Sequence, residues 1–251
     1  MKRIHGILLA GSMVLAGTQA SAAAFTIQGL QAVGQTNFQN ISDDLAAAIW
    51  MNPSNSAEPH SAGIIPVGFQ IGVEATSLQV NSTAWKALGN ARQSAMVIPK
   101  LRISAGIPFG LDFSYMYTSL PSSNIKITGY EGRMAFGSMI PLPMVEFNVR
   151  AYQSKLTGVP ELSAKDTGFA AMLGADLPIF KPYIEMGQVQ STSTPKGIAA
   201  TGILGLKEYK KTSTTMAVGA KLSIFPFLNL TGEYATVGSK KLYTLKLAAE
   251  F

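Results

Sequence analysis

The sequence predicts an all-β fold: a transmembrane, antiparallel up-and-down β-barrel of about ten strands, preceded by a short N-terminal helical segment. Apolar and polar residues alternate in one segment after another from residue 61 to the C-terminus. Hydrophobic residues make up 47% of the chain and charged residues only 14%, whereas soluble domains carry about 25% charged residues. Beyond the first residues, no uninterrupted apolar run is long enough for a membrane-spanning helix. A closed barrel is the other structure that satisfies every backbone group in a bilayer.

Residues 1–23 have the pattern of a secretory signal peptide. Lys2 and Arg3 precede the apolar stretch IHGILLAGSMVLAG, and the small-residue segment TQASAA supplies a cleavage site around residues 20–23. The chain contains no cysteine, which excludes a disulfide framework and thiol chemistry in the exported protein. The net charge is +6, but the basic residues are spread along the chain, so no nucleic-acid partner is expected.

Residues 24–60 do not alternate and predict a short helix. Ser42 is a plausible N-cap, Asp43 and Asp44 suit a first turn, and LAAAIW supplies the helix that Pro53 ends. Two alternatives remain open for this segment. It could be a periplasmic lead-in that packs on the barrel rim, or a plug that enters the lumen, with Asp43, Asp44, Asn52 and Pro53 as plug residues.

The barrel is predicted to occupy residues 61–251. Ten segments carry the alternation, and an even number is typical of single-chain bacterial barrels. Around Tyr130 the parity changes, because Ile125 and Ile127 are odd whereas Tyr130, Met134 and Phe136 are even. A β-bulge is the simplest interpretation of that change. The ten segments are 65–76, 97–107, 109–118, 130–139, 142–153, 166–177, 182–190, 211–225, 227–235 and 240–251.

The connections between these segments are of two alternating kinds. Four are short and contain proline, at 107–110, 140–144, 177–181 and 224–227, whereas the others are longer and polar. Short turns at one end and long loops at the other are typical of outer-membrane barrels, in which the short turns are periplasmic. Ten strands would then place both chain ends in the periplasm.

The polar face of the strands is predicted to line the lumen. In a soluble sandwich, the remaining alternative, that face would meet water instead. Charges of both signs beside glycines suit a narrow lumen in which side chains pair. The lumen-lining candidates are Glu74, Lys100, Arg102, Asp112, Glu131, Arg133, Glu146, Arg150, Asp176, Glu185, Lys221, Glu233 and Lys246.

The terminal stretch LYTLKLAAEF, taken with the features above, resembles a Gram-negative outer-membrane β-barrel protein. In that superfamily a last strand ending in Phe is the signal read by the barrel-assembly machinery, and Tyr243, Leu245, Leu247 and Phe251 match it. The resemblance implies an outer-membrane location. It also implies outer-membrane lipid, lipopolysaccharide, the assembly machinery and periplasmic chaperones as partners.

A second, shorter resemblance covers the N-terminal segment. Phe25, Asp43-Asp44 and Asn52-Pro53 resemble the start of the outer-membrane long-chain fatty-acid and hydrocarbon transporters. In that family the N-terminus plugs the barrel, and hydrophobic substrates leave through its wall. The chain departs from the family in its predicted strand number, because those barrels have fourteen strands, and in carrying Ser54 where Ala is usual.

The residues favour a non-enzymatic protein without cofactor or metal. The single histidine after the signal, His60, lies before the first predicted strand and is expected to be solvated. No His- or Cys-rich cluster, P-loop or nucleophile motif is present in the sequence. We therefore predict a narrow porin-like or transport barrel for ions or for small or hydrophobic solutes. A structural or surface-contact barrel is the alternative, and a barrel enzyme is the least favoured.

Overall fold

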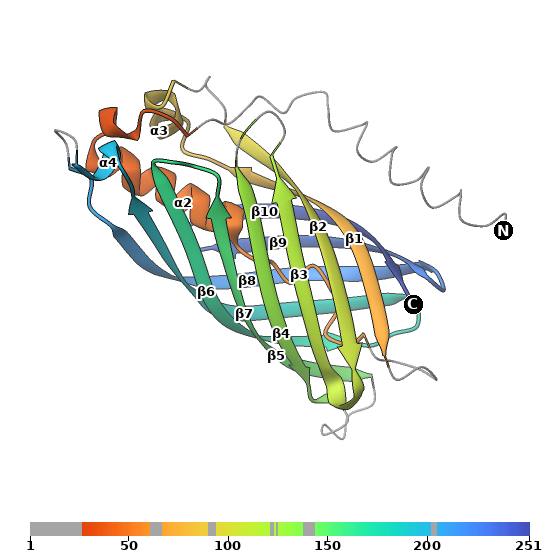
Figure 1. Ribbon diagram of the computed structural model, residues 1–251. Coiled ribbons are helices and arrows are strands. Elements are labelled where there is room, and N and C mark those ends of the chain that lie inside the picture. The colour runs from red at the N-terminus through yellow and green to blue at the C-terminus, as the bar shows by residue number, and fades with distance from the viewer. Residues whose placement is uncertain are drawn as a thin grey trace.

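The computed structural model describes residues 27–60, 67–89, 94–120, 123, 125–137, 144–201 and 205–251. The predicted signal peptide lies outside them. The described residues form ten strands in a closed antiparallel barrel, in which β1 pairs with both β2 and β10 (Figure 1). The predicted fold class is therefore confirmed. The strands are β1 (Gly68–Gln79), β2 (Ala95–Ile107), β3 (Leu111–Ser119), β4 (Lys126–Ala135), β5 (Val145–Thr157), β6 (Leu162–Ala175), β7 (Phe180–Pro195), β8 (Tyr209–Phe225), β9 (Leu228–Val237) and β10 (Lys240–Glu250).

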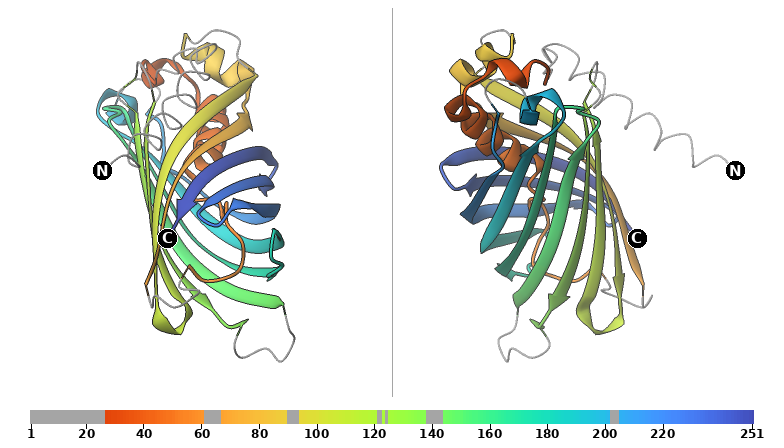
Figure 2. Two further views of the ribbon diagram at one scale, coloured as in Figure 1. Left: turned by 90° about the vertical axis from the view of Figure 1, so that its right-hand side faces the viewer. Right: turned by 60° about the vertical axis from the view of Figure 1, so that its left-hand side comes forward.

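The connections differ between the two ends of the barrel. At the short-turn end, the 3-10 turn η3 (Pro108–Gly110) joins β2 to β3, with Phe109 and Gly110 both at φ 73°. At the long-loop end, α3 (Ser82–Ala87) follows β1 and α4 (Ile198–Thr201) follows β7. Figure 2 shows the helices gathered at the long-loop end. Most of the predicted turn at 140–144 lies outside the described residues.

The N-terminal helix is longer than the sequence predicted. Helix α2 runs from Gln35 to Ile49, so Ser42 lies in its middle and is not its N-cap. The apolar residues Phe38, Ile41, Leu45 and Ile49 follow helical spacing and are all buried. Burial of this stripe inside the barrel outweighs the capping preference of Ser42, because most helical stability in proteins comes from tertiary packing.

Most of the described N-terminal segment lies inside the barrel, and only its first residues contact the rim. The 3-10 turn η2 (Leu30–Ala32) contacts the long-loop end, where the Leu30 amide donates to Glu161 in the β5–β6 loop at 2.7 Å. Helix α2 then descends into the barrel, and residues 50–60 continue along the lumen (Figures 1 and 2). The expectation that both chain ends lie at the short-turn end is therefore wrong for Ile27, the first described residue.

The parity change near Tyr130 is not a bulge. Strand β4 pairs with β3 and β5 in continuous register from Lys126 to Ala135. Ile125 and Ile127 face the interior, where they join the apolar core around α2, whereas Tyr130 faces outward. The apolar residues change face along the strand because its two halves have different surroundings. Within the described pairs, a register irregularity occurs instead between β8 and β9, near Ser223.

The outer wall of the barrel changes character along the strands. Outward residues are apolar near the short turns, as Phe69, Ile103 and Leu245 illustrate, and we call this part of the outer wall the apolar belt. Near the long loops the outward residues are polar. The stretch from Tyr243 to Phe251 spans about 26 Å along the strand and about 20 Å along the axis of a barrel with strands tilted by about 40°. On nine strands the change from apolar to polar outward residues can be located to one pair of positions. In the direction from the short turns to the long loops, the last apolar and the first polar residue are Ala75/Ser77, Tyr117/Ser119, Tyr130/Thr128, Ala151/Gln153, Phe169/Thr167, Met186/Gln188, Met216/Thr214, Tyr234/Thr236 and Tyr243/Lys241.

Candidate functional site in the barrel lumen

The lumen next to the apolar belt is filled by residues 50–60, which we call the plug segment. Every residue of this segment is buried except the half-buried Pro59. The segment has no regular secondary structure, so its backbone groups need partners other than one another. The barrel wall supplies them.

Wall cations donate to the plug backbone. The Arg150 Nη2 donates to the Met51 carbonyl at 2.9 Å, and the Arg102 Nη2 donates to the Asn52 carbonyl at 2.7 Å. Further along, the Lys246 Nζ reaches the Ser54 carbonyl at 3.0 Å. The same pattern holds for Lys100 on Trp50 and for Arg133 on Ser56. Charged donors strengthen these hydrogen bonds in a water-poor interior.

Wall carboxylates balance those cations. Arg150 makes a bidentate pair with Glu185, at 2.7 and 2.9 Å, and also pairs with Glu131. The Arg102 Nε lies 2.6 Å from Glu74. All these side chains are almost fully buried. Ion pairs of this kind are stable in a protein interior only when both charges and their hydrogen-bonding capacity are satisfied.

Ser54 bonds to the barrel wall through its amide, its hydroxyl and its carbonyl. Its amide donates to Glu233 at 2.7 Å and its hydroxyl donates to Glu74 at 2.7 Å. Its φ of 35° lies in the left-handed region, which is costly for a serine and persists where surrounding contacts over-determine the backbone. Asn52 lies beside it and accepts from Lys100 at 2.7 Å. Pro53, between them, is buried.

The end of the plug segment near the short turns is held by ion pairs. Glu58 pairs with Lys221 at 2.6 Å and also with Lys181. Burial raises the pKa of Glu58, but attraction to Lys221 and hydrogen bonds to its neighbours lower it more, to about 2. His60 is buried as well, with its Nδ1 2.9 Å from Asp112, so the expectation of a solvated histidine is wrong.

The lumen at the long-loop end is apolar. Helix α2 packs there on wall residues such as Leu78, Leu156, Val189 and Leu242. Tyr152 marks the boundary, because its hydroxyl accepts from the Trp50 indole at 2.8 Å and its ring lies 4.5 Å from the Arg150 guanidinium carbon. The lumen therefore has two layers, an apolar layer around α2 and a charged layer around the plug segment. They meet where α2 ends and the plug segment begins.

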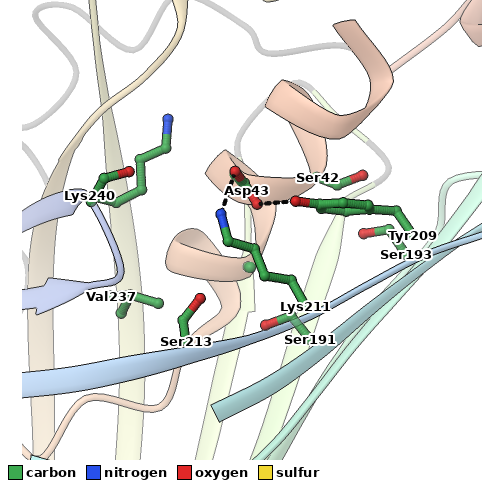
Figure 3. Close-up of a pocket in the computed structure, with 11 residues that line it drawn as sticks. Ser42, Asp43, Ser191, Ser193, Tyr209, Lys211, Ser213, Val237 and Lys240 are labelled. Carbon is green, nitrogen blue, oxygen red and sulfur yellow. Dashed lines mark hydrogen bonds and ion pairs between the residues drawn. The ribbon is translucent and has the colours of Figure 1, made fainter. Parts of the chain in front are cut away.

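Both acidic plug candidates on α2 are bonded at the long-loop end. Asp43 accepts from Lys211 at 2.8 Å and from the Tyr209 hydroxyl at 3.3 Å (Figure 3). The small cavity beside them, of about 10 Å³, has room for about one water molecule. Asp44 is fully buried, accepts from the Trp85 indole at 2.9 Å and pairs with Lys240. These contacts fix α2 to β8, β10 and α3.

Most of the predicted lumen residues meet in the charged layer. Glu146 is only half-buried near the short turns, and Asp176 is exposed beyond the end of β6, where it pairs with Lys181 at 2.7 Å. Asp176 is therefore a rim residue, and its assignment to the lumen was wrong. The buried ones are Glu74, Lys100, Arg102, Asp112, Glu131, Arg133, Arg150, Glu185, Lys221, Glu233 and Lys246.

Sequence reasoning missed several residues that complete this layer. Tyr183 donates to Glu233 at 2.6 Å, and the Asn148 amide donates to the Ala57 carbonyl at 2.8 Å. Both have the parity of recognised lumen residues on their strands, Glu185 and Arg150, so parity alone could have identified them. Lys181 has the parity of Glu185 but falls in the predicted turn at 177–181, and Glu58 could not be found by parity because it lies on the plug segment.

No metal or membrane-helix feature accompanies this site. In the described part of the chain, no three His, Cys, Asp or Glu side chains gather as metal ligands would. Among the same residues, none of the helices combines the length and hydropathy needed to cross a membrane. What distinguishes the molecule is a closed strand order with an apolar outer belt and a charged, plugged lumen.

The described residues form a closed antiparallel β-barrel of ten strands. It is similar to the N-terminal β-barrel domain of Pseudomonas aeruginosa OprF, at 10% identity and a TM-score of 0.37, over 72% of this chain and 97% of that one. It is also similar to the KdgM porin, at 11% identity and a TM-score of 0.37, over 72% and 99% of the two chains. Ail, the attachment invasion locus protein of Yersinia pestis, follows at 12% identity and a TM-score of 0.31, over 74% and 97%.

No family model matches the chain, and no curated protein matches it in sequence. The resemblance of the N-terminal segment to the fatty-acid and hydrocarbon transporters therefore stays a prediction. So does the role of Tyr243, Leu245, Leu247 and Phe251 as an assembly signal. In the structure Tyr243, Leu245 and Phe251 point outward and are exposed.

Proposed function

We propose that the protein is a transport barrel of a Gram-negative outer membrane that keeps its lumen closed with its own plug segment. Small or hydrophobic solutes pass when that segment moves. The observation that carries the proposal is that a separate stretch of chain, and not the wall side chains alone, fills the lumen. The wall holds it through ion pairs and hydrogen bonds, which water can replace if the segment withdraws.

The charged layer would then line the aqueous path. Cations and carboxylates alternate around it, as in the pairs of Arg102 with Glu74 and of Arg150 with Glu185. A ten-stranded wall encloses far less space than the 16–18-stranded porins. Such a path suits ions and small solutes, and the apolar layer around α2 offers a hydrophobic solute an entrance from the long-loop end.

A disulfide between plug and wall tests this proposal. A Cβ placed on Gly174 of β6 would lie 2.9 Å from the Cβ of Ala57, so Ala57→Cys with Gly174→Cys can form a disulfide after a small shift. The natural chain has no cysteine to compete. In liposome swelling assays we expect solute entry with the reduced pair and a strong loss of entry after oxidation.

The two single-cysteine variants serve as controls and should respond equally under both redox conditions. If neither the reduced pair nor the unmodified protein admits any solute above protein-free liposomes, transport is rejected. A surface-contact barrel would then take its place. That second candidate is favoured by the long-loop end, where η2, α3 and α4 form a structured surface.

A further inference from the structure

We propose that the outer face of β5 and β6 binds a phosphorylated glycolipid of the outer leaflet, such as the lipid part of lipopolysaccharide. Its phosphate lies on Lys155 and Lys165, and one of its acyl chains lies in the apolar groove nearer the short turns. The proposal rests on the membrane placement of the barrel and not on transport.

The two lysines form an unbalanced positive pair. Lys155 on β5 and Lys165 on β6 are direct cross-strand partners, and both are exposed. Like charges directly opposite each other destabilise a sheet. Lys126, at the same end of β4, is exposed too. Within the described residues, none of these three lysines has an ion-pair partner within 4.0 Å.

The carboxylates close to this pair in the sequence do not neutralise its charge. Glu161, in the loop between the two strands, accepts from the Gly29 and Leu30 amides at 3.3 and 2.7 Å. Asp166 follows Lys165 directly but faces the interior and is fully buried. The positive charge is therefore left for an anion from outside the chain.

An apolar groove lies on the same face of the barrel. It has a volume of about 480 Å³ and runs over the outer surface from β3 to β7. Small residues on neighbouring strands, Gly132, Ala151 and Ala171, leave the hollow, and Phe113 and Phe169 flank it. A groove of this shape and apolar lining fits a hydrocarbon chain.

The groove and the lysines are aligned along the strands. Ala151 and Lys155 share the outer face of β5, as Phe169 and Lys165 share that of β6. Each pair is separated by about 13 Å along its strand, with Gln153 or Thr167 between them. A headgroup on the lysines therefore leaves its acyl chains over the groove.

The charge also favours this face over others. At the same end of β1 and β3, the outward residues are Ser77, Gln79 and Ser119, which carry no charge. Lysines just beyond the apolar belt on the long-loop side lie at the depth of outer-leaflet headgroups. Two adjacent lysines match a lipid of net negative charge, such as one with two phosphate groups and no cation, better than a zwitterionic phospholipid.

Native mass spectrometry of the detergent-purified, full-length protein tests the proposal. Bisphosphorylated lipid A is titrated onto the unmodified protein, onto Lys155→Ala/Lys165→Ala, and onto the groove-filling variant Ala151→Leu. We expect the double variant to bind at least tenfold more weakly, and Ala151→Leu to bind severalfold more weakly. Lipid A without phosphates should bind the unmodified protein as weakly as the double variant binds the phosphorylated form.

Matched controls on the opposite side are Lys241→Ala and Ala249→Leu, both outward positions of β10. They should leave the affinity unchanged. Heat-modifiable migration on gels verifies that each variant is folded. Equal affinity of the double variant and the unmodified protein would overturn the proposal. So would equal affinity for lipid A with and without phosphates.

Discussion

The two layers of the lumen are opposites, and each is also the opposite of the wall outside it. On β10, Lys246 points inward beside the outward Leu245, whereas Leu242 points inward beside the outward Lys241. On β5, the inward Arg150 follows the outward Val149, and the inward Leu156 follows the outward Lys155. Where the outer face of the wall is apolar, the lumen is charged, which is the reverse of the arrangement in a soluble protein. Where the outer face is polar, the interior is apolar, as in a soluble protein.

This difference shows what holds each part of the N-terminal segment. In the apolar layer, α2 is held mainly by the burial of its apolar side chains, which is a non-directional interaction. The backbone of α2 needs no partner in the wall, because its groups bond to one another within the helix. In the charged layer, the segment is irregular, and its carbonyls accept from wall cations. Four substitutions test this division of the lumen, from the largest expected effect to the smallest.

The largest effect is expected in the charged layer. Arg150→Met removes a partner of Glu131, which keeps Arg133, and leaves the buried Glu185 without its ion-pair partner. Breaking a buried pair from one side costs about 3–5 kcal/mol, which urea titration of the heat-modifiable gel shift can measure. Arg150→Met/Glu185→Gln should recover part of the loss. No recovery would mean that the layer is not held by charge balance.

A slightly smaller effect is expected in the apolar layer. Phe38→Ala removes a fully buried ring from α2 and should lower the free energy of unfolding by about 3–4 kcal/mol. Its loss should be independent of salt, unlike that of charged-layer variants. Ile49→Val, at the last residue of α2, is the mild control at about 1 kcal/mol. A salt-dependent loss at Phe38 would contradict the division into layers.

The outer belt can be tested with two neighbouring residues. Leu222→Arg places a charge on the apolar outer face of β8 and should cost about 2–4 kcal/mol near the bilayer midplane. Ser223→Arg points the other way, toward the lumen, at a half-buried position and should cost less. Equal losses in lipid-reconstituted unfolding experiments would contradict the assignment of the inner and outer faces.

The smallest effect is a pH dependence at the end of the plug segment. The folded pKa of Glu58 is about 2 against an ordinary 4.5. Its depressed value contributes stability that is complete above pH 4.5 and is lost as the pH falls toward 2. The loss is modest because Lys221 keeps Glu250 and Lys181 keeps Asp176 as partners.

Unfolding of Glu58→Gln, measured from pH 6 to pH 2, should lack this part of the pH dependence. Thr212→Val, an exposed position near the long loops, is the control and should keep it. If Glu58→Gln and the unmodified protein lose stability in parallel over that range, another carboxylate is responsible.

Local pattern predicted most of the wall. Period-2 alternation placed all ten strands, and parity put Arg102, Arg150, Glu185 and Lys246 in the lumen, because side chains alternate strictly between the two faces of a strand. The same pattern was misread where the environment reverses. The parity change near Tyr130, for which a bulge is the simplest local interpretation, follows from that reversal.

The local pattern of the sequence accounts for the closed antiparallel barrel, because alternation, turn length and composition are local properties of the chain. Only the tertiary structure decided that residues 50–60 lie inside the lumen, that α2 begins at Gln35, and that His60 is buried against Asp112. These features depend on contacts between residues far apart in the chain, such as Ser54 with Glu233. The local spacing of apolar and polar residues cannot predict such a contact, because the two residues meet only when the barrel has closed around the segment.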